Sequence, residues 1–299
     1  MKKEKRFSIL FFMPFMVCFI LFWLIPFVYG CYMSVNKVSL TKGNVGFVGL
    51  SNYLALFNEA SMYASEFIEA LKNTVLFVII SVPLLVITAF ILALIIDNLP
   101  DKLKGFFRTI YFMSYAVSVT AVSAIFLWLF NGNGGFINNI IAKPISWLES
   151  QPYAWIVLAI VTLWWTVGYN MILFINGLNS IDGALYEAAS VDGANFLTRL
   201  RYITLPGLKN VMTYVTLMSI ISSFNLYGQS SLITKGGPSQ STRSLIMVIY
   251  DTILQKNNLG VGSAMSIVMG IIVMAFALCQ QYLAKEKKDL MEVNGSEKP

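Results

Sequence analysis

The sequence predicts an all-α integral membrane protein that crosses the bilayer with six helices. Hydrophobic residues make up 57% of the 299 positions, charged residues make up only 12%, and the mean hydropathy is +0.70. A spanning helix needs about 20 consecutive, mostly apolar residues. Six runs without a charged residue reach that length, namely residues 8–33, 74–96, 109–130, 154–178, 210–233 and 260–283. They fill nearly the whole of one membrane domain, which is predicted to cover residues 8–284.

The first run, residues 8–33, follows a short basic segment and must be distinguished from a signal peptide. The apolar core of a signal peptide is about 7 to 15 residues long and ends at a small-residue cleavage site. This run is longer, contains Trp23 and has no A-x-A sequence. We therefore expect it to be retained as the first transmembrane helix.

The distribution of Lys and Arg predicts the orientation in the membrane. Of the 21 basic residues, fourteen lie in the two termini and in the loops after the second and fourth runs, and seven lie in the other loops. Cytoplasmic loops carry the excess of positive charge. The basic N-terminus (residues 1–7) and the charged tail (residues 285–299) are therefore predicted to be cytoplasmic in a multi-pass protein of the cell (plasma or inner) membrane. This asymmetry, together with anionic membrane lipid, accounts for the net charge of +6, so no nucleic-acid partner is expected.

Several kinds of chemistry are disfavoured by residues that the sequence lacks. It contains no His, and Cys18, Cys31 and Cys279 lie singly, far from any C-x-x-C spacing. It has no G-x-x-x-x-G-K-[ST] phosphate loop for ATP. None of the six runs holds an ionisable residue, whereas proton-driven transporters usually place such groups inside the membrane. We therefore predict no catalytic residue, no metal site and no cofactor in this chain.

A charged, helix-forming segment separates the fourth run from the fifth. Asp182 is suited to cap the start of a helix, and Leu185, Ala188 and Ala189 follow at the i, i+3 and i+4 positions of one face. Gly193 is placed to end that helix, and a residue in this position is expected to adopt a positive φ.

A second short helix is predicted to follow, with Phe196 and Leu200 on one face and Pro206 at its end. Helices of about eight residues are marginal in water when isolated. The predicted hairpin, within residues 180–206, must therefore be stabilised by packing. Its surface either packs against its own helix bundle or docks on another protein.

The sequence LYEAASVDGA at residues 185–194, followed by ITLP at residues 203–206, resembles the EAA loop of permease subunits from binding-protein-dependent ABC importers. The residues at the motif positions are Glu187, Ala188, Ala189, Asp192, Gly193 and Pro206. The resemblance implies the fold of a type I ABC importer permease and identifies this segment as the coupling helix that seats in a cleft of the ATPase subunit.

Four further segments resemble carbohydrate-type permeases, namely FVGLSNYLALF (47–57), KNTVLF (72–77), FFRTIYFM (106–113) and TKGGPSQST (234–242). The FVGL and GGP sequences are more similar to the F-type half of the maltose transporter than to its G-type partner. Ser114 departs from the family, which often has Pro after the aromatic-rich stretch. The resemblance extends over nearly the full chain.

Uncharged polar and aromatic residues lie near the middle of the fourth and fifth runs. Ser222, Asn225 and Gln229 recur at i, i+3 and i+7, which predicts one polar stripe along a helix. Such residues either hydrogen-bond between helices or contact a substrate. The resemblance assigns the second role to segments that contain Trp164, Trp165, Tyr169, Phe224 and Asn225. The candidate substrate-binding residues are therefore Trp164, Trp165, Tyr169, Ser222, Phe224, Asn225 and Gln229.

The resemblance implies an ATP-driven importer in which this chain moves a sugar or oligosaccharide by alternating access. The implied partners are a second permease subunit of the same fold, a dimer of ABC ATPase subunits that binds ATP and Mg, an extracytoplasmic solute-binding protein, the sugar and membrane lipid. Two alternatives stay open, which are import of another polyol-like solute such as glycerol phosphate and a self-sufficient facilitator or channel. A membrane-bound enzyme would lack any set of acid, base or metal ligands.

Overall fold

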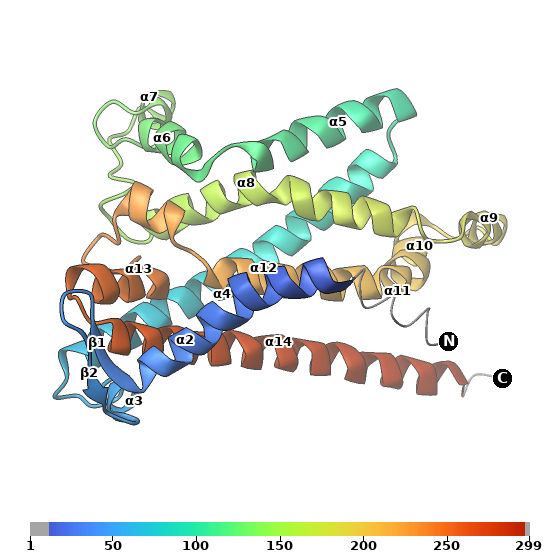
Figure 1. Ribbon diagram of the computed structural model, residues 1–299. Coiled ribbons are helices and arrows are strands. Elements are labelled where there is room, and N and C mark those ends of the chain that lie inside the picture. The colour runs from blue at the N-terminus through green and yellow to red at the C-terminus, as the bar shows by residue number, and fades with distance from the viewer. Residues whose placement is uncertain (1–11, 297–299) are drawn as a thin grey trace, which may run out of the picture. The chain divides into compact units, whose positions relative to one another are not determined.

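The computed structural model describes the backbone of residues 12–296 and the side chains of residues 12–285. The chain divides into two compact units, one made of Met1–Glu69 and Leu245–Ile271 and the other of Ala70–Ser244 and Ile272–Pro299. Figure 1 shows that the elements are almost all helical, as predicted. The predicted basic N-terminus and the side chains of the predicted tail beyond residue 285 lie outside the described residues.

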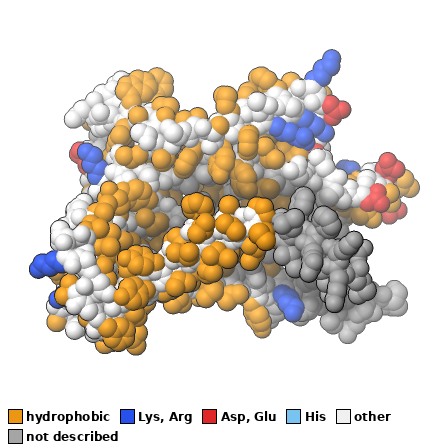
Figure 2. Space-filling view, in the orientation of Figure 1, with side chains coloured by type: hydrophobic (Ala, Val, Ile, Leu, Met, Phe, Trp, Pro, Cys, Tyr) orange, Lys and Arg blue, Asp and Glu red, His pale blue; other side chains and the backbone are white. Residues whose placement is uncertain are grey.

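Four helices in the described residues are long and apolar enough to cross a membrane. They are Phe12–Ser34, α4 (Met62–Asp97), α8 (Tyr153–Leu178) and the part Leu259–Lys285 of α14 (Leu259–Ser296). They correspond to the first, second, fourth and sixth predicted runs. Phe12–Ser34 includes the π-helical turn η1 (Ile20–Leu24) and α2 (Ile25–Ser34). Its most apolar part contains no buried residue, and Figure 2 shows hydrophobic side chains over the outward surface of α2.

The third predicted run, residues 109–130, is wrong as a single helix. The chain instead forms α5 (Asp101–Met113), the 3-10 turn η2 (Ser114–Ala116) and α6 (Val119–Leu129). The helices before and after the break are bent by 98°. Val117 is extended at the break, and the Ser118 side chain accepts the N–H of Ala121 at 3.3 Å, as an N-cap does. A new helix therefore starts inside a stretch that looks uniformly apolar in sequence.

The fifth predicted run, residues 210–233, is also interrupted. α12 (Lys209–Phe224) ends at Asn225, and the chain is helical again in η4 (Ser230–Thr234). Asn225 donates its side-chain Nδ2 to the Ile221 carbonyl at 2.8 Å, a local bond that competes with continuing the helix. Beyond the break, a Cβ at Gly228 would lie 2.6 Å from the Val119 side chain, so this segment approaches α6 more closely than a helix of larger residues could. The predicted polar stripe on one continuous helix is therefore wrong.

The first unit carries the only strands that the described residues contain. β1 (Asn36–Ser39) and β2 (Gly43–Phe47) pair antiparallel, with Asn36 opposite Phe47. The side chain of Asn52, in the short α3 (Ser51–Leu54), donates to the carbonyls of Ser34 at 2.8 Å and Asn36 at 3.0 Å. These bonds join α3 to the end of the first helix and to the β1–β2 hairpin.

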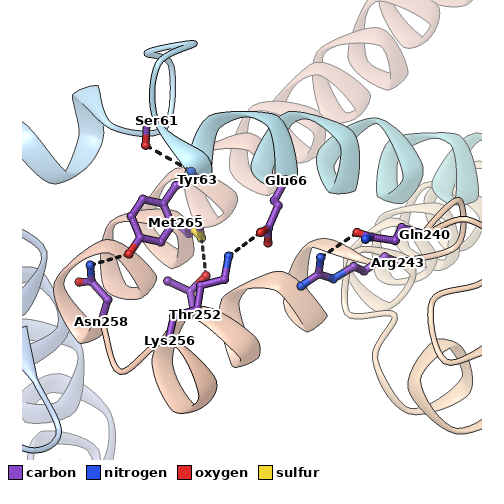
Figure 3. A network of polar contacts seen from close by, with 9 residues as sticks. All are labelled: Ser61, Tyr63, Glu66, Gln240, Arg243, Thr252, Lys256, Asn258 and Met265. Atoms are coloured by element: carbon purple, nitrogen blue, oxygen red, sulfur yellow. Dashed lines mark hydrogen bonds and ion pairs between the residues drawn. The ribbon is translucent and has the colours of Figure 1, made fainter.

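α13 (Leu245–Tyr250) continues into the π-helical turn η5 (Asp251–Gln255), and polar side chains connect the start of α4 to the residues between η5 and α14. Figure 3 shows these contacts. Lys256 Nζ lies 2.5 Å from Glu66 Oε1, and Asn258 Nδ2 donates to the Tyr63 hydroxyl at 3.0 Å. The first unit is thus held by hydrogen bonds and an ion pair between residues that are far apart in sequence.

The second unit is organised around α8, which lies between α5 and α12 in Figure 1. One hydrophobic cluster joins α4, α8 and α12 through residues such as Ala93, Phe174 and Val215, and another joins α6 to α8 through Phe126 and Val161. Its other helices are α7 (Phe136–Ile141), α9 (Gly183–Val191), α10 (Phe196–Arg199), η3 (Leu200–Thr204) and α11 (Leu205–Gly207).

Gly168 permits the closest backbone approach between α5 and α8. A Cβ at this position would overlap the carbonyl oxygen of Tyr111. Since only glycine lacks a Cβ, α5 can rest directly on the backbone of α8 here. This contact fixes the position of the residues that follow Tyr111, including Tyr115 in η2.

Candidate functional site

The first helix of the predicted hairpin is α9, and local hydrogen bonds define both of its ends. Asp182 Oδ1 accepts the N–H of Ala184 at 2.9 Å, which confirms the predicted N-cap. Gly193 has a φ of +71°, which confirms the predicted positive φ. The N–H of Ala194 donates to the Ala189 carbonyl at 2.9 Å, the long bond of a Schellman ending. The start and end of α9 are therefore encoded in the segment itself.

The second arm of the hairpin differs from its prediction in where it ends. Asn195 caps α10 by accepting the N–H of Thr198 at 2.9 Å. The helical backbone then runs through η3 and α11 to Gly207, so Pro206 does not end it. Proline is tolerated there because it lies in the first turn of α11, where its missing N–H breaks no intrahelical bond. We call residues 182–207 the EAA hairpin.

The EAA hairpin exposes apolar side chains that nothing in the described residues covers. No residue of α9 or α10 is buried, and Leu185, Val191 and Leu197 are 53%, 88% and 69% exposed. Glu187 and Ala188 are exposed on the same helix. Figure 2 shows acidic and hydrophobic side chains next to each other at α9. Two bonds hold the arms together, one between the Tyr186 hydroxyl and Thr204 Oγ1 at 3.0 Å and one in which Arg199 Nη1 donates to Ser190 Oγ at 3.3 Å.

A cavity of about 250 Å³ lies between α8 and α12. Its lining residues are Leu85, Tyr115, Thr166, Tyr169, Asn170, Met218, Ser219, Ile221 and Ser222. The rings of Tyr115 and Tyr169 stack with centroids 5.2 Å apart, and Asn170 Nδ2 donates to Ser219 Oγ at 3.1 Å. None of the lining residues is charged. Aromatic faces with hydroxyl and amide groups suit a neutral, hydroxyl-rich solute, and we call this site the α8–α12 cavity.

Only two of the seven predicted substrate residues line the α8–α12 cavity, namely Tyr169 and Ser222. Trp165 Nε1 donates to the Val117 carbonyl at 2.9 Å, next to the break between α5 and α6. Phe224 is fully buried and packs edge-on against Phe276, with ring centroids 5.3 Å apart.

The other three predicted residues lie elsewhere. Trp164 is half-exposed and contacts the edge of Phe126. Asn225 is exposed and bonds to its own helix, and Gln229 is buried. Contacts within the chain therefore hold several of the predicted residues in place, and the structure does not bring the seven together.

Sequence reasoning did not single out Tyr115, Thr166 and Ser219 as site residues. Tyr115 was hidden inside an apolar run whose break was not foreseen. Thr166 and Ser219 gave a weak signal, since each is a lone hydroxyl in a long apolar helix. Asn170 was visible in the same way, and its position one residue after Tyr169 was the available clue.

Comparison with known proteins gives consistent results over nearly the whole chain. Residues 89–288 match the family model described as "Binding-protein-dependent transport system inner membrane component". A probable ABC transporter permease protein of Bacillus subtilis (strain 168), YurN, is 30% identical over 294 residues, which cover 96% of this chain and 99% of that protein. The lactose transport system permease protein LacF of Rhizobium radiobacter is 33% identical over 251 residues, covering 81% of this chain and 82% of that protein.

Solved structures share the fold. A chain of a bacterial alginate ABC transporter, crystallised in complex with an alginate pentasaccharide-bound periplasmic protein, superposes with a TM-score of 0.80. The match covers 95% of this chain and 96% of that chain at 20% sequence identity. This chain thus shares the helical fold of that transporter chain.

Proposed function

This chain belongs to the family of binding-protein-dependent transport system inner membrane components, and we propose that it is the permease subunit of an ATP-driven importer of a sugar or oligosaccharide. The single observation that carries the substrate class is the α8–α12 cavity, whose lining offers two stacked tyrosines, hydroxyls and an amide but no charge. A phosphorylated or carboxylate solute would require a cation to offset the cost of burying its charge. The lactose permease among its relatives supports the same substrate class.

The proposed permease has six spans. Four of them are the long helices, another is the bent pair of α5 with α6, and the remaining one is α12 continued by η4. α12 alone has 16 residues and at 1.5 Å per residue would extend about 24 Å, less than the roughly 30 Å of a bilayer core. The segment that resumes at η4 supplies the remaining length.

The EAA hairpin is proposed as the coupling element that docks on a partner ATPase subunit. Its caps define both ends of α9 although no residue of the helix is buried, and exposed apolar residues lie on the same helix as Glu187. A short helix with an uncovered face is suited to a cleft, where a partner would supply the packing that the helix lacks, and Ala188 and Ala189 let its backbone approach closely. ATP binding by the partner, not by this chain, would drive alternating access through this contact.

Reconstitution tests the proposed function. The chain, its second permease subunit, the ATPase and the solute-binding protein are placed in liposomes, and uptake of radiolabelled sugars is measured. We expect uptake only when ATP and the loaded binding protein are both present. Full, ATP-independent equilibration of sugar by this chain alone would instead establish a facilitator, and uptake restricted to phosphorylated solutes would reject the sugar assignment.

The proposed topology is tested with single cysteines in a background from which Cys18, Cys31 and Cys279 have been replaced by Ser. Ser51, Ser190 and Ser239 are all exposed in the structure. Cysteines at Ser51 and Ser239 are expected to react with a membrane-impermeant thiol reagent in intact cells, whereas one at Ser190 reacts only after permeabilisation. The reverse pattern would place the EAA hairpin outside the cell and reject docking on an ATPase.

A further inference from the structure

A second and larger cavity has no place in the proposed transport cycle. It has a volume of about 700 Å³, within the range of about 300 to 1,000 Å³ typical of small-molecule sites. It lies between the second arm of the EAA hairpin, the first half of α12 and residues 280–284 of α14. Its lining residues are Arg201, Tyr202, Leu205, Pro206, Lys209, Met212, Thr213, Thr216, Gln280, Leu283 and Ala284.

The charged residues that line this cavity are both cations. Arg201 and Lys209 line it, and no Asp or Glu is among the lining residues that the structure describes. The Arg201 guanidinium carbon lies 5.8 Å from the centroid of the exposed Tyr202 ring, a cation–π arrangement at the rim. The cavity therefore favours an anion.

Lys209 is the main physical reason that the cavity favours an anion. Its Nζ atom is buried, and it has no hydrogen-bond partner within the described part of the chain. The side-chain Oε1 of Gln280 is likewise buried and unpartnered, while its Nε2 donates to the Thr213 carbonyl at 3.2 Å. An isolated buried ammonium group is costly unless an anion pairs with it. An anionic ligand with a hydroxyl donor would satisfy both Lys209 and Gln280.

The rest of the lining is apolar and indicates what else the ligand must contain. Leu205, Met212 and Leu283 line the same cavity as the two cations. In the proposed six-span topology α12 and α14 both cross the membrane, so the parts of them that line this cavity lie near the headgroup region of the bilayer. We propose that this cavity binds one anionic phospholipid, with the phosphate at Lys209 and Arg201 and an acyl chain along the apolar residues. Basic pockets between transmembrane helices are suited to such headgroups.

The proposal is tested by titrating the purified protein, in the assembly in which it is extracted, with phosphatidylglycerol or phosphatidylcholine and counting bound lipids by native mass spectrometry. We expect one tight phosphatidylglycerol site. Lys209→Gln is expected to weaken that site about tenfold, equivalent to about 1.4 kcal/mol. The matched control is Lys102→Gln, which makes the same change at an exposed residue outside the cavity.

Thermal stability in lipid-free detergent separates a folding defect from lost binding. Lys209→Gln is expected to be no less stable than the unaltered protein, because it removes an unpaired buried charge. Any of the following results would overturn the proposal. They are unchanged phosphatidylglycerol binding by Lys209→Gln, equal binding of both lipids, and occupation of the site by inorganic phosphate alone. A cysteine at Thr216 that crosslinks to the second permease subunit would likewise show a protein, not a lipid, in the cavity.

Discussion

The EAA hairpin and the α8–α12 cavity are built in opposite ways. The hydrogen bonds that cap and join the arms of the hairpin connect residues within 182–207, and its apolar side chains stay exposed. The cavity joins residues from four elements far apart in sequence, and its buried Asn170 is paired inside the chain. The hairpin thus has locally defined helix ends and an uncovered surface, whereas the cavity is formed where four elements of the chain pack together. In the proposed function the hairpin therefore depends on a partner protein, and the cavity depends on correct helix packing.

The largest effect is expected from Gly193→Val, which disfavours the backbone conformation that ends α9 in the EAA hairpin. Gly193 has a φ of +71°, and a left-handed conformation costs a residue with a Cβ about 1 to 2 kcal/mol, with β-branched residues worse. The end of α9 should be lost, and with it sugar uptake, while the chain remains in the membrane. Uptake and membrane abundance are measured on the same cells.

Two controls make this prediction specific. Gly193→Asn is expected to retain most uptake, because Asn tolerates the left-handed region. Gly105→Val makes the same change in α5, where φ is not positive and a Cβ meets nothing within 4 Å, so its uptake should be normal. If Gly193→Val transports as well as Gly105→Val, the conformation of the hairpin does not matter for function.

Gly168→Ala is the corresponding substitution for the α8–α12 cavity, because it disturbs the packing of α5 against α8. The added Cβ would overlap the Tyr111 carbonyl, forcing α5 away from α8 and moving Tyr115 from Tyr169. Overpacking of this kind typically costs about 1 to 3 kcal/mol. The expected result is a lower melting temperature of the purified protein together with reduced uptake.

The matched control is Gly270→Ala in α14, where nothing lies within 4 Å of the new Cβ. It should be neutral or slightly stabilising, because Ala has the higher helix propensity. Equal melting temperatures for the two variants would mean that α5 and α8 do not pack as closely as the structure has them.

Local encoding explains why the sequence predicted one region well and the other poorly. Asp182 and Gly193 act on their immediate neighbours, so their roles could be inferred from position alone. The break at Ser118 and the end of α12 at Asn225 depend on a cap inside an apolar run and on the approach of Gly228 to Val119. The hydrophobicity of the sequence indicates neither the cap nor the close approach. For this reason two spans were wrongly predicted as single helices.

The same difference explains the site residues. A sequence can identify an aromatic or a polar residue in a span. It does not reveal whether a neighbouring helix covers that side chain or leaves it facing a cavity. Tyr169 is beside the cavity, whereas Phe224 is covered by Phe276, although both are aromatic residues followed by Asn in the sequence. Only the packing of α8, α12 and α14 distinguishes them.

Glu187→Lys is expected to weaken association with the ATPase about tenfold, about 1.4 kcal/mol, by inverting a charge on the exposed surface of α9. Folding should be unaffected, since Glu187 has no buried contact. Co-purification of the ATPase with the permease measures the effect. Glu149→Lys is the control, because it inverts an exposed charge on the side predicted to be extracellular. Equal ATPase recovery from both variants would remove Glu187 from the proposed interface.

The smallest effect comes from two adjacent serines that separate substrate contact from helix packing. Ser222 is exposed and lines the α8–α12 cavity, whereas Ser223 is buried and accepts a hydrogen bond from Ser81 Oγ at 2.9 Å. Ser222→Ala should raise the KM for uptake about fivefold without changing the melting temperature, which corresponds to one hydrogen bond of about 1 kcal/mol.

Ser223→Ala should do the reverse, because it leaves the Ser81 hydroxyl buried without this partner. The expected loss is about 1 to 3 kcal/mol of stability with an unchanged KM. Measuring both quantities on both variants decides the point, since the substitution is identical and the positions are consecutive. A Ser222→Ala variant that loses stability and keeps its KM would show that the cavity is a packing gap, and the substrate path would then have to be sought away from α12.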